Sequence, residues 1–166
     1  MPHVRLLVVH HTPSPAVRGL LEAIVAGASV PELADVEVVV EPALSATASD
    51  VLSANGIVLL TPANIGYMSG ALKHFFDTIY YPCLDATRGM PWGLVVHGND
   101  DTSGAVRSVE KVAGALQWEK VAPVVEVVAA PGFRDDDVVR AAASLERASE
   151  HPLARAIVDA ASERAL

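Results

Sequence analysis

Three segments of the sequence combine small, polar and histidine residues of the kind that can bind a phosphate or a flat ring. Each follows an apolar run, and together they span residues 10–17, 61–70 and 97–104. In the first segment, Ser14 is suited to cap a helix, and Pro15 suits the first helical position. The N–H groups of residues 16–18 should then be unpaired, beside the hydroxyl groups of Thr12 and Ser14. Such a turn can bind a phosphate, because a helix N-terminus carries partial positive charge.

The same first segment also reads as an ordinary Ser-Pro helix start. It contains no glycine, so it is neither the G-x-G-x-x-G loop of dinucleotide-binding proteins nor a P-loop. Arg18 would add positive charge to the site if its side chain turned back. His10, His11 and His97 end two apolar runs, but no carboxylate accompanies them at ligand spacing, so we expect no metal site.

The second segment follows an apolar run that ends in Thr61-Pro62. Asn64, Gly66 and Tyr67 come next, and a Ser-Gly pair then opens a stretch of helical period. This order offers a flat ligand both backbone amides and an aromatic ring. In the third segment, small polar residues can present amides and carbonyl groups to the edge of a polar ring. Thr102 or Ser103 should then cap the next helix, although an ordinary loop and cap would look the same.

The elements that position these segments alternate between short apolar runs and stretches of helical period. The apolar runs predict buried strands at residues 5–10, 36–41, 56–61, 93–97 and 124–128. The helical stretches cover residues 15–28, 69–80 and 103–118, with a short helix around 48–54. Strands separated by helices cannot pair as hairpins, so the sheet should be parallel with helices on both faces. Ligands of such sheets bind outside the carboxyl ends of the strands, where the strand order reverses.

Composition narrows the classes of partner and compartment. The chain has 166 residues and a formal net charge of −8, which predicts one domain over residues 1–166 and argues against nucleic acid as a partner. No apolar run reaches the roughly 18 residues of a membrane span, and the first residues do not read as a secretion signal. Cys83 is the only cysteine, so no internal disulfide and no multi-thiolate metal site is expected. We therefore expect a cytoplasmic protein without a membrane partner.

The C-terminal part of the sequence predicts one more helix and a terminal segment. The acidic residues 135–137 favour a helix start, because carboxylates there accept from free N–H groups. His151-Pro152 should then break or kink that helix. Residues 152–166 are left as an extra C-terminal helical segment.

The segment 61–77 resembles the second flavin loop of the flavodoxin-like NAD(P)H-dependent FMN reductases and quinone reductases. That family has Thr/Ser-Pro, a variable loop with glycine, and then Gly-Ala-Leu-Lys with an aromatic residue before Asp, and this chain has Gly-Ala-Leu-Lys at 70–73 and Asp77. With the order of elements, the resemblance covers residues 4 to 128. It implies a flavodoxin-like α/β fold, which is a doubly wound five-stranded parallel sheet in the order 2-1-3-4-5. It also implies FMN as cofactor, NADH or NADPH as reductant, and a quinone or another small electron acceptor.

Carried over position by position, the roles of that family give three groups of FMN-binding residues. The phosphate would be bound by Thr12, Ser14, Ala16 and Val17. The ribityl chain and the isoalloxazine would contact Pro62, Ala63, Asn64, Ile65, Gly66 and Tyr67. The pyrimidine side would meet His97, Gly98 and Asn99. No catalytic side chain is expected, because the flavin itself carries the redox chemistry. The first loop departs from the family pattern Ser/Thr-x-Thr-Gly-Asn-Thr, which removes part of the expected phosphate cradle.

Two other functions remain open at this point. A non-enzymatic electron carrier is compatible with the net charge of −8, because carriers meet basic partners by electrostatic steering. A binding module that keeps the fold without FMN is the other alternative, since a fold does not secure a function. The Gly-Ala-Leu-Lys segment favours the reductase. Related reductases are oligomers, so the resemblance also implies a homodimer or a homotetramer.

Overall fold

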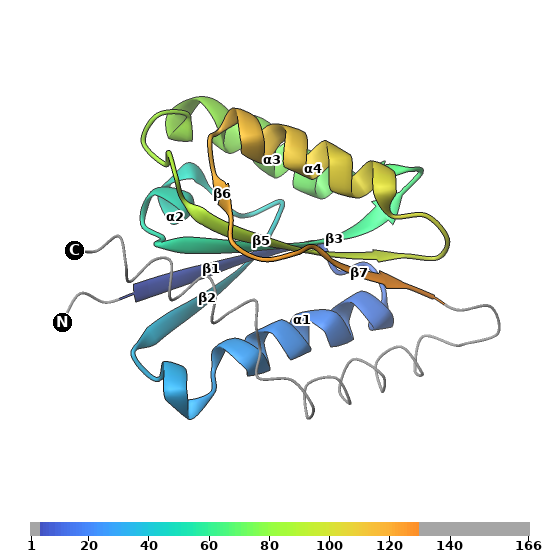
Figure 1. Ribbon diagram of the computed structural model, residues 1–166, viewed down its shortest axis with the longest axis horizontal. Helices are drawn as coiled ribbons and strands as arrows, with labels where there is room; N and C mark the ends of the chain where they lie inside the picture. Colours follow the sequence, from blue (N-terminus) through green and yellow to red (C-terminus); the bar gives the residue numbers. More distant parts are fainter. Residues whose placement is uncertain (1–3, 130–166) are drawn as a thin grey trace.

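The computed structural model describes residues 4–129, which form a β-sheet with helices on both of its faces (Figure 1). The strands are β1 (Val4–His10), β2 (Val36–Pro42), β3 (Gly56–Asn64), β4 (Tyr67–Met68), β5 (Pro91–Gly98), β6 (Glu119–Lys120) and β7 (Val125–Val128). The helices are α1 (Pro15–Ala28), α2 (Ala48–Leu52), α3 (Gly70–Cys83) and α4 (Ser103–Ala115), with a 3₁₀ turn η1 (Pro31–Leu33) after α1.

The strand order confirms the doubly wound, flavodoxin-like topology. The order is β2-β1-β3-β5, and β5 pairs at its far edge first with β6 and then with β7. All of these pairs are parallel. β5 and β7 are the fourth and fifth strands expected from the sequence, so the predicted order 2-1-3-4-5 is confirmed. The two additional strands, β4 and β6, have two residues each, and elements this short leave no periodic pattern.

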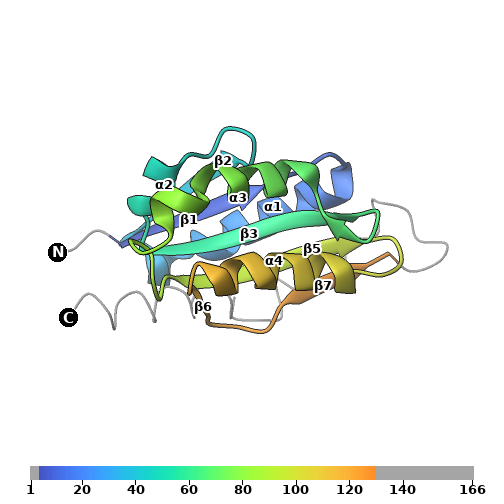
Figure 2. The same ribbon diagram turned by 90° about the horizontal axis from the view of Figure 1, so that it is seen from above.

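Side chains of β1 show why both faces of the sheet are covered. Leu7 and Val9 belong to the larger core cluster, which also contains residues of α2, α3 and α4. Leu6 and Val8 point to the opposite face and belong to a cluster packed by residues of α1. Figures 1 and 2 show α1 on one side of the sheet and α2, α3 and α4 on the other. A strand that is apolar on both faces is typical of a parallel sheet between helical layers.

The predicted helices agree with the structure in place but differ at their ends. α3 runs from Gly70 through Pro82 to Cys83, whereas the sequence predicts a helix over residues 69–80. α4 ends at Ala115, whereas the sequence predicts a helix to residue 118. The reason is a Schellman ending: Gln117 takes a left-handed backbone with φ 58, and the N–H of Trp118 donates to the carbonyl of Ala113. The predicted helix from residue 135 and the segment 152–166 lie outside the described residues. Within residues 4–129, no helix is long and apolar enough to cross a membrane.

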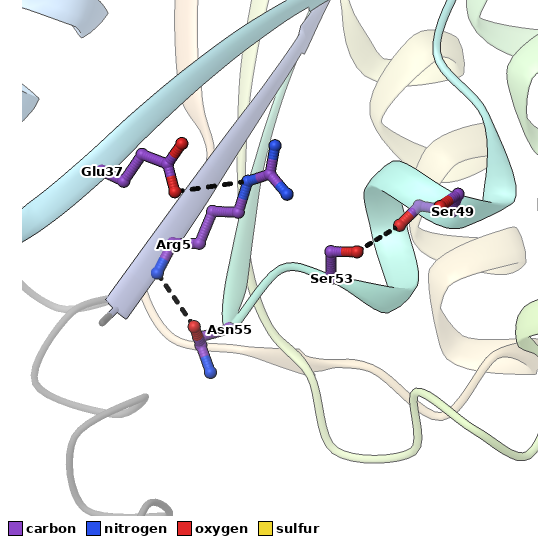
Figure 3. A network of polar contacts seen from close by, with 5 residues as sticks. All are labelled: Arg5, Glu37, Ser49, Ser53 and Asn55. Atoms are coloured by element: carbon purple, nitrogen blue, oxygen red, sulfur yellow. Dashed lines mark hydrogen bonds and ion pairs between the residues drawn. The ribbon is translucent and has the colours of Figure 1, made fainter. Parts of the chain in front are cut away.

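Polar contacts at the amino ends of the strands tie the sheet together (Figure 3). The backbone N–H of Arg5 donates to Oδ1 of Asn55 at 2.9 Å, and the Arg5 Nε lies 3.7 Å from a carboxylate oxygen of Glu37. Nearby, the Ser53 hydroxyl donates to the carbonyl of Ser49 at the end of α2. All three contacts are exposed, and the ion pair between Arg5 and Glu37 contributes about 0 to 1 kcal/mol. They lie at the sheet edge opposite the carboxyl ends of the strands, so we assign them to the fold and not to a ligand site.

Candidate functional site

A cavity of 210 Å³ lies at the carboxyl ends of the central strands. It is lined by residues that follow β1, β3 and β5, namely Pro13, Ser14, Val17, Pro62, Ala63, Asn64, His97, Gly98 and Asn99. All of them except Pro13 are among the residues that the sequence predicts for cofactor binding. The strand order reverses between β1 and β3, and this is where doubly wound sheets bind ligands. Because pockets for drug-sized ligands have volumes of about 300 to 1,000 Å³, a ligand as large as FMN would be only partly enclosed.

The other predicted residues lie around this cavity without lining it. They are Thr12, Ala16, Ile65, Gly66 and Tyr67. Thr12 is turned toward β1, where its hydroxyl lies 3.2 Å from Nδ1 of His10. Ala16 is fully buried in the first turn of α1, so neither its side chain nor its backbone is exposed. The remaining three residues form an exposed tip between β3 and β4. Their predicted roles therefore require the tip to reach over the mouth of the cavity.

The first turn of α1 presents fewer free amides than the sequence predicts. The N–H of Val17 donates to the hydroxyl oxygen of Ser14 at 3.4 Å, and the N–H of Arg18 donates to the carbonyl of Ser14 at 3.0 Å. The expectation of three unpaired N–H groups is wrong, because Ser14 caps its own helix and the first helical hydrogen bond already uses Arg18. The N–H of Ala16 has no acceptor among residues 4–129. One N–H group, rather than three, is left without an acceptor, and the residue that carries it is fully buried.

Two histidines and one arginine gather beside the same turn. His10, His11 and Arg18 lie close enough together that His11 and Arg18 contribute to lowering the pKa of His10, although burial is the largest cause. The Nδ1 atom of His11 is buried, and in the described part of the chain it has no hydrogen-bond partner. The positive charge of Arg18 favours an anionic ligand here.

The lowered pKa of His10 predicts an acid-sensitive fold. In the unfolded chain this histidine should titrate near 6.5, and in the folded chain it titrates lower. The unfolded state therefore binds more protons in the interval just below 6.5, so the free energy of unfolding should fall as the pH drops from about 7.5 to 5.5. We expect the variant His10→Asn to lose less of this free energy over the same interval. Urea unfolding of both proteins at several pH values measures the difference, and identical pH profiles would contradict the assignment.

The second segment forms a tight β-hairpin. β3 and β4 pair antiparallel through Ala63 with Met68 and Asn64 with Tyr67, which leaves Ile65 and Gly66 as a two-residue turn. Both turn residues have positive φ, 51 for Ile65 and 69 for Gly66, as in a type I′ turn. A β-branched residue in this region is a true conformational outlier. The Ile65 side chain is also fully exposed, so no packing within the described chain accounts for the strain.

Side-chain hydrogen bonds fix the base of this hairpin. The buried Thr61 hydroxyl accepts from the N–H of Ser69 at 3.1 Å, and the Ser69 hydroxyl in turn caps α3 by accepting from the N–H of Leu72. On the other side, the N–H of Met68 donates to the hydroxyl oxygen of Ser108 in α4 at 3.2 Å. The hairpin therefore rises from a base that is held by both α3 and α4, and its exposed tip is not a loosely attached loop.

The third segment leads into α4, whose N-terminal cap is formed by a different residue from those expected. Thr102 stands at the N-cap position of α4, but its hydroxyl donates to the carboxylate of Glu126 on β7. The cap is supplied by Asp101, whose carboxylate accepts from the N–H of Ser103 at 2.9 Å and from its hydroxyl at 2.8 Å. These hydrogen bonds lower the pKa of Asp101. The prediction of a cap by Thr102 or Ser103 is wrong, because the sequence does not show that β7 brings an acceptor to Thr102.

The described residues offer binding groups but no metal site. His97 is 6% exposed and lines the cavity at the end of β5. Among residues 4–129, no three histidine, cysteine or acidic side chains are grouped in a way that could hold a metal ion. Cys83 is buried at the end of α3, and burial raises the pKa of its thiol, which keeps it in the unreactive protonated form. The arrangement is suited to holding a flat, partly polar ligand.

Comparison with known proteins supports the fold. No protein-family model matches the chain, and no curated protein matches it. An oxidoreductase from Corynebacterium diphtheriae superposes with a TM-score of 0.67 at 20% identity, covering 95% of this chain and 98% of that one. Flavodoxin 1 from Bacillus cereus gives 0.66 at 17% identity, with 89% and 96% covered. A WrbA-like flavodoxin from Agrobacterium tumefaciens gives 0.61 at 16% identity, with 92% and 98% covered. The chain therefore has a flavodoxin-like fold.

Proposed function

We propose that the chain binds FMN at the 210 Å³ cavity and acts as an FMN-dependent oxidoreductase. The observation that carries this proposal is the convergence of all three predicted flavin loops on one cavity. That cavity lies at the reversal of the strand order in a sheet whose structural neighbours include flavodoxins and an oxidoreductase. The cavity thus lies where ligands of this fold bind, and residues of all three predicted loops line it.

The ring end of the cavity fits a flat ligand. Pro62, Ala63 and Gly98 present short or absent side chains, so backbone groups can approach the edge of a ring. Gly98 is already closely surrounded, because a Cβ atom there would lie 2.8 Å from Cγ2 of Thr102 and 3.6 Å from Cβ of Ala63. Tyr67, which is 46% exposed, adds an aromatic surface at the rim. The fit predicts that the ring rests against backbone rather than between long side chains.

The phosphate end offers a smaller set of donors. Ser14 lines the cavity at the start of α1, whereas Ala16 in the same turn is fully buried. The hydroxyl of Thr12 and the guanidinium of Arg18 flank that turn in the sequence. Two hydroxyl groups and one positive charge can bind a phosphate, but they replace a cradle of several amides. We therefore propose that FMN is held with moderate affinity and exchanges with free flavin.

The bound flavin would supply hydride and electron transfer. The chain would contribute placement of the ring, a dry inner wall formed by the buried strand ends, and the open side through which reactants enter. NADH or NADPH would be the reductant, and a quinone or another small molecule would be the acceptor. We also propose that the active form is a homodimer or a homotetramer located in the cytoplasm.

Turnover by the FMN-loaded protein tests this function. With NADH or NADPH and a small quinone, we expect saturable quinone reduction that depends on added FMN, with parallel double-reciprocal lines because both reactants use one cleft in turn. A fully loaded protein that shows no turnover with any pair would reject the enzyme. The electron-carrier alternative would then be favoured, since several structural neighbours are flavodoxins and the chain carries a net charge of −8. The mass in solution checks the oligomer.

Relieving the backbone strain at Ile65 should raise the stability of the fold and lower the affinity for FMN. In Ile65→Asn, a residue that tolerates positive φ replaces one that does not, so the free energy of unfolding should rise by about 1 kcal/mol. FMN affinity should fall severalfold, because an apolar side chain is lost from the rim. Urea unfolding and flavin titration measure the two effects. Leu44→Asn is the matched control, since Leu44 is an exposed apolar residue without positive φ. An equal gain in stability in the control would contradict the strain at Ile65.

A further inference from the structure

We propose that Gly104, in the first turn of α4, is a positioning residue for the β3–β4 hairpin. A Cβ atom on Gly104 would lie 1.9 Å from the carbonyl oxygen of Gly66 and 2.9 Å from its carbonyl carbon. Both distances are far inside van der Waals contact, so the Gly66 carbonyl occupies the space that any other residue at 104 would need. Only glycine at this position of α4 allows the hairpin to lie where it does.

The contact is rigid because backbone meets backbone. The atoms nearest to Gly104 are the carbonyl and Cα atoms of Gly66, not the end of a side chain that could rotate away. Gly104 itself does not have positive φ, so its own backbone conformation does not demand glycine. Glycine is also a poor helix former compared with alanine. Close approach of the hairpin is therefore the physical reason for glycine here.

A hydrogen bond one helical turn further on completes the contact. Ser108 follows Gly104 by four positions and lies on the same face of α4, where its hydroxyl oxygen accepts from the N–H of Met68. The Ser108 hydroxyl then donates to the carbonyl of Ala105 at 2.8 Å, which fixes its rotamer. We call Gly104 and Ser108 together the α4 seat. It holds the hairpin at Gly66 and at Met68, on either side of Tyr67.

The N-terminal end of α4 also contacts the third segment, residues 97–104. Thr102, at the N-cap position, packs its methyl group beside Gly98 and donates its hydroxyl to Glu126. One helix end therefore sets the positions of the hairpin and of the residues at the end of β5. If FMN binds as proposed above, the α4 seat fixes the separation of two of its three loops and the orientation of Tyr67 toward the ring. This consequence rests on the proposed function, whereas the seating of the hairpin does not.

Gly104→Ala tests the seat, with Gly114→Ala as the matched control. Gly114 lies in the same helix, and a Cβ atom there would meet nothing within 4 Å. In the protein without ligand, Gly104→Ala should shift the backbone amide resonances of residues 64–68, and the control should leave them unchanged. In the FMN complex, Gly104→Ala should weaken binding by about tenfold or more and alter the visible circular dichroism of the flavin. A merely destabilised fold would not change the spectrum of flavin that remains bound.

The outcomes separate the seat from the proposed function. Unchanged amide resonances for residues 64–68 in Gly104→Ala would overturn the positioning role. If the resonances shift in Gly104→Ala but the wild-type protein does not bind FMN, the positioning role of the α4 seat is upheld and the proposed function is rejected. Ser108→Ala removes the acceptor of the Met68 N–H without adding an atom, so it tests the seat even if Gly104→Ala does not fold. In that variant, an unmoved Met68 amide resonance would also count against the seat.

Discussion

Replacing Ser14 by aspartate should weaken FMN binding by at least about 100-fold without lowering the melting temperature. Ser14 both caps α1 and lines the cavity. Aspartate caps a helix as well as serine does, and its charge is favourable at a helix N-terminus, so the fold should be unaffected or slightly stabilised. A phosphate about 4 Å from that new charge would be repelled by about 4 kcal/mol at an effective dielectric constant of about 20. Solvent and salt reduce this repulsion, which leaves the expected loss at about 100-fold or more.

Riboflavin makes the Ser14→Asp result specific, because it has the same ring as FMN and no phosphate. We expect the variant to bind riboflavin as the wild type does. Ser14→Asn is the matched control: it keeps a capping side chain without the charge, and its FMN affinity should stay within severalfold of the wild type. Equal losses for FMN and riboflavin in Ser14→Asp would show that the phosphate does not lie at this turn. Calorimetric titration of the three proteins with both flavins gives the comparison.

Replacing Phe75 by alanine should produce one of the largest losses of stability among single changes in α3. Phe75 is fully buried in the larger core cluster, and its ring centroid lies 5.5 Å from that of Phe76. Removing a buried aromatic ring costs about 3–5 kcal/mol, which is a large part of the roughly 5–15 kcal/mol that stabilises a typical domain. Urea unfolding measures the change.

The neighbouring His74 supplies the control for Phe75. It lies in the same helix and is exposed, so His74→Ala should change the free energy of unfolding by less than about 0.5 kcal/mol. A loss below about 1 kcal/mol for Phe75→Ala would mean that α3 does not pack on the sheet as described. FMN binding by the destabilised variant should still raise its melting temperature, because the cavity lies at the carboxyl ends of the strands and Phe75 lies in the middle of α3.

The fold was largely predictable because burial leaves its mark on short, local stretches of sequence. β1 reads as a strand between two helical layers since Leu6, Leu7, Val8 and Val9 are all apolar, and all four are buried. The start of α1 was predictable from Ser14 and Pro15 for an equally local reason. Most of the cavity lining followed from the topology, because parallel strands bring the loops at their carboxyl ends to one edge.

The parts that sequence reasoning missed depend on contacts between distant segments or on competition within one turn. Nothing local shows that Glu126 on β7 would take the Thr102 hydroxyl, or that the Gly66 carbonyl would lie against Gly104. The unpaired N–H groups predicted for Val17 and Arg18 were lost to Ser14, whose hydroxyl and carbonyl oxygens accept from them. A signal for the hairpin was present in retrospect, since a glycine in a short polar break favours a two-residue turn, but isoleucine before it obscured that signal.

Titration of FMN into the purified protein decides whether the cavity is a flavin site. We expect saturable quenching of flavin fluorescence with one FMN per chain, and a higher melting temperature, since a ligand at about 100 times its dissociation constant adds about 2.7 kcal/mol of stability. Riboflavin should bind more weakly than FMN, because it lacks the group that the α1 turn holds. If saturating FMN changes neither the flavin spectrum nor the melting temperature, the cavity does not bind flavin.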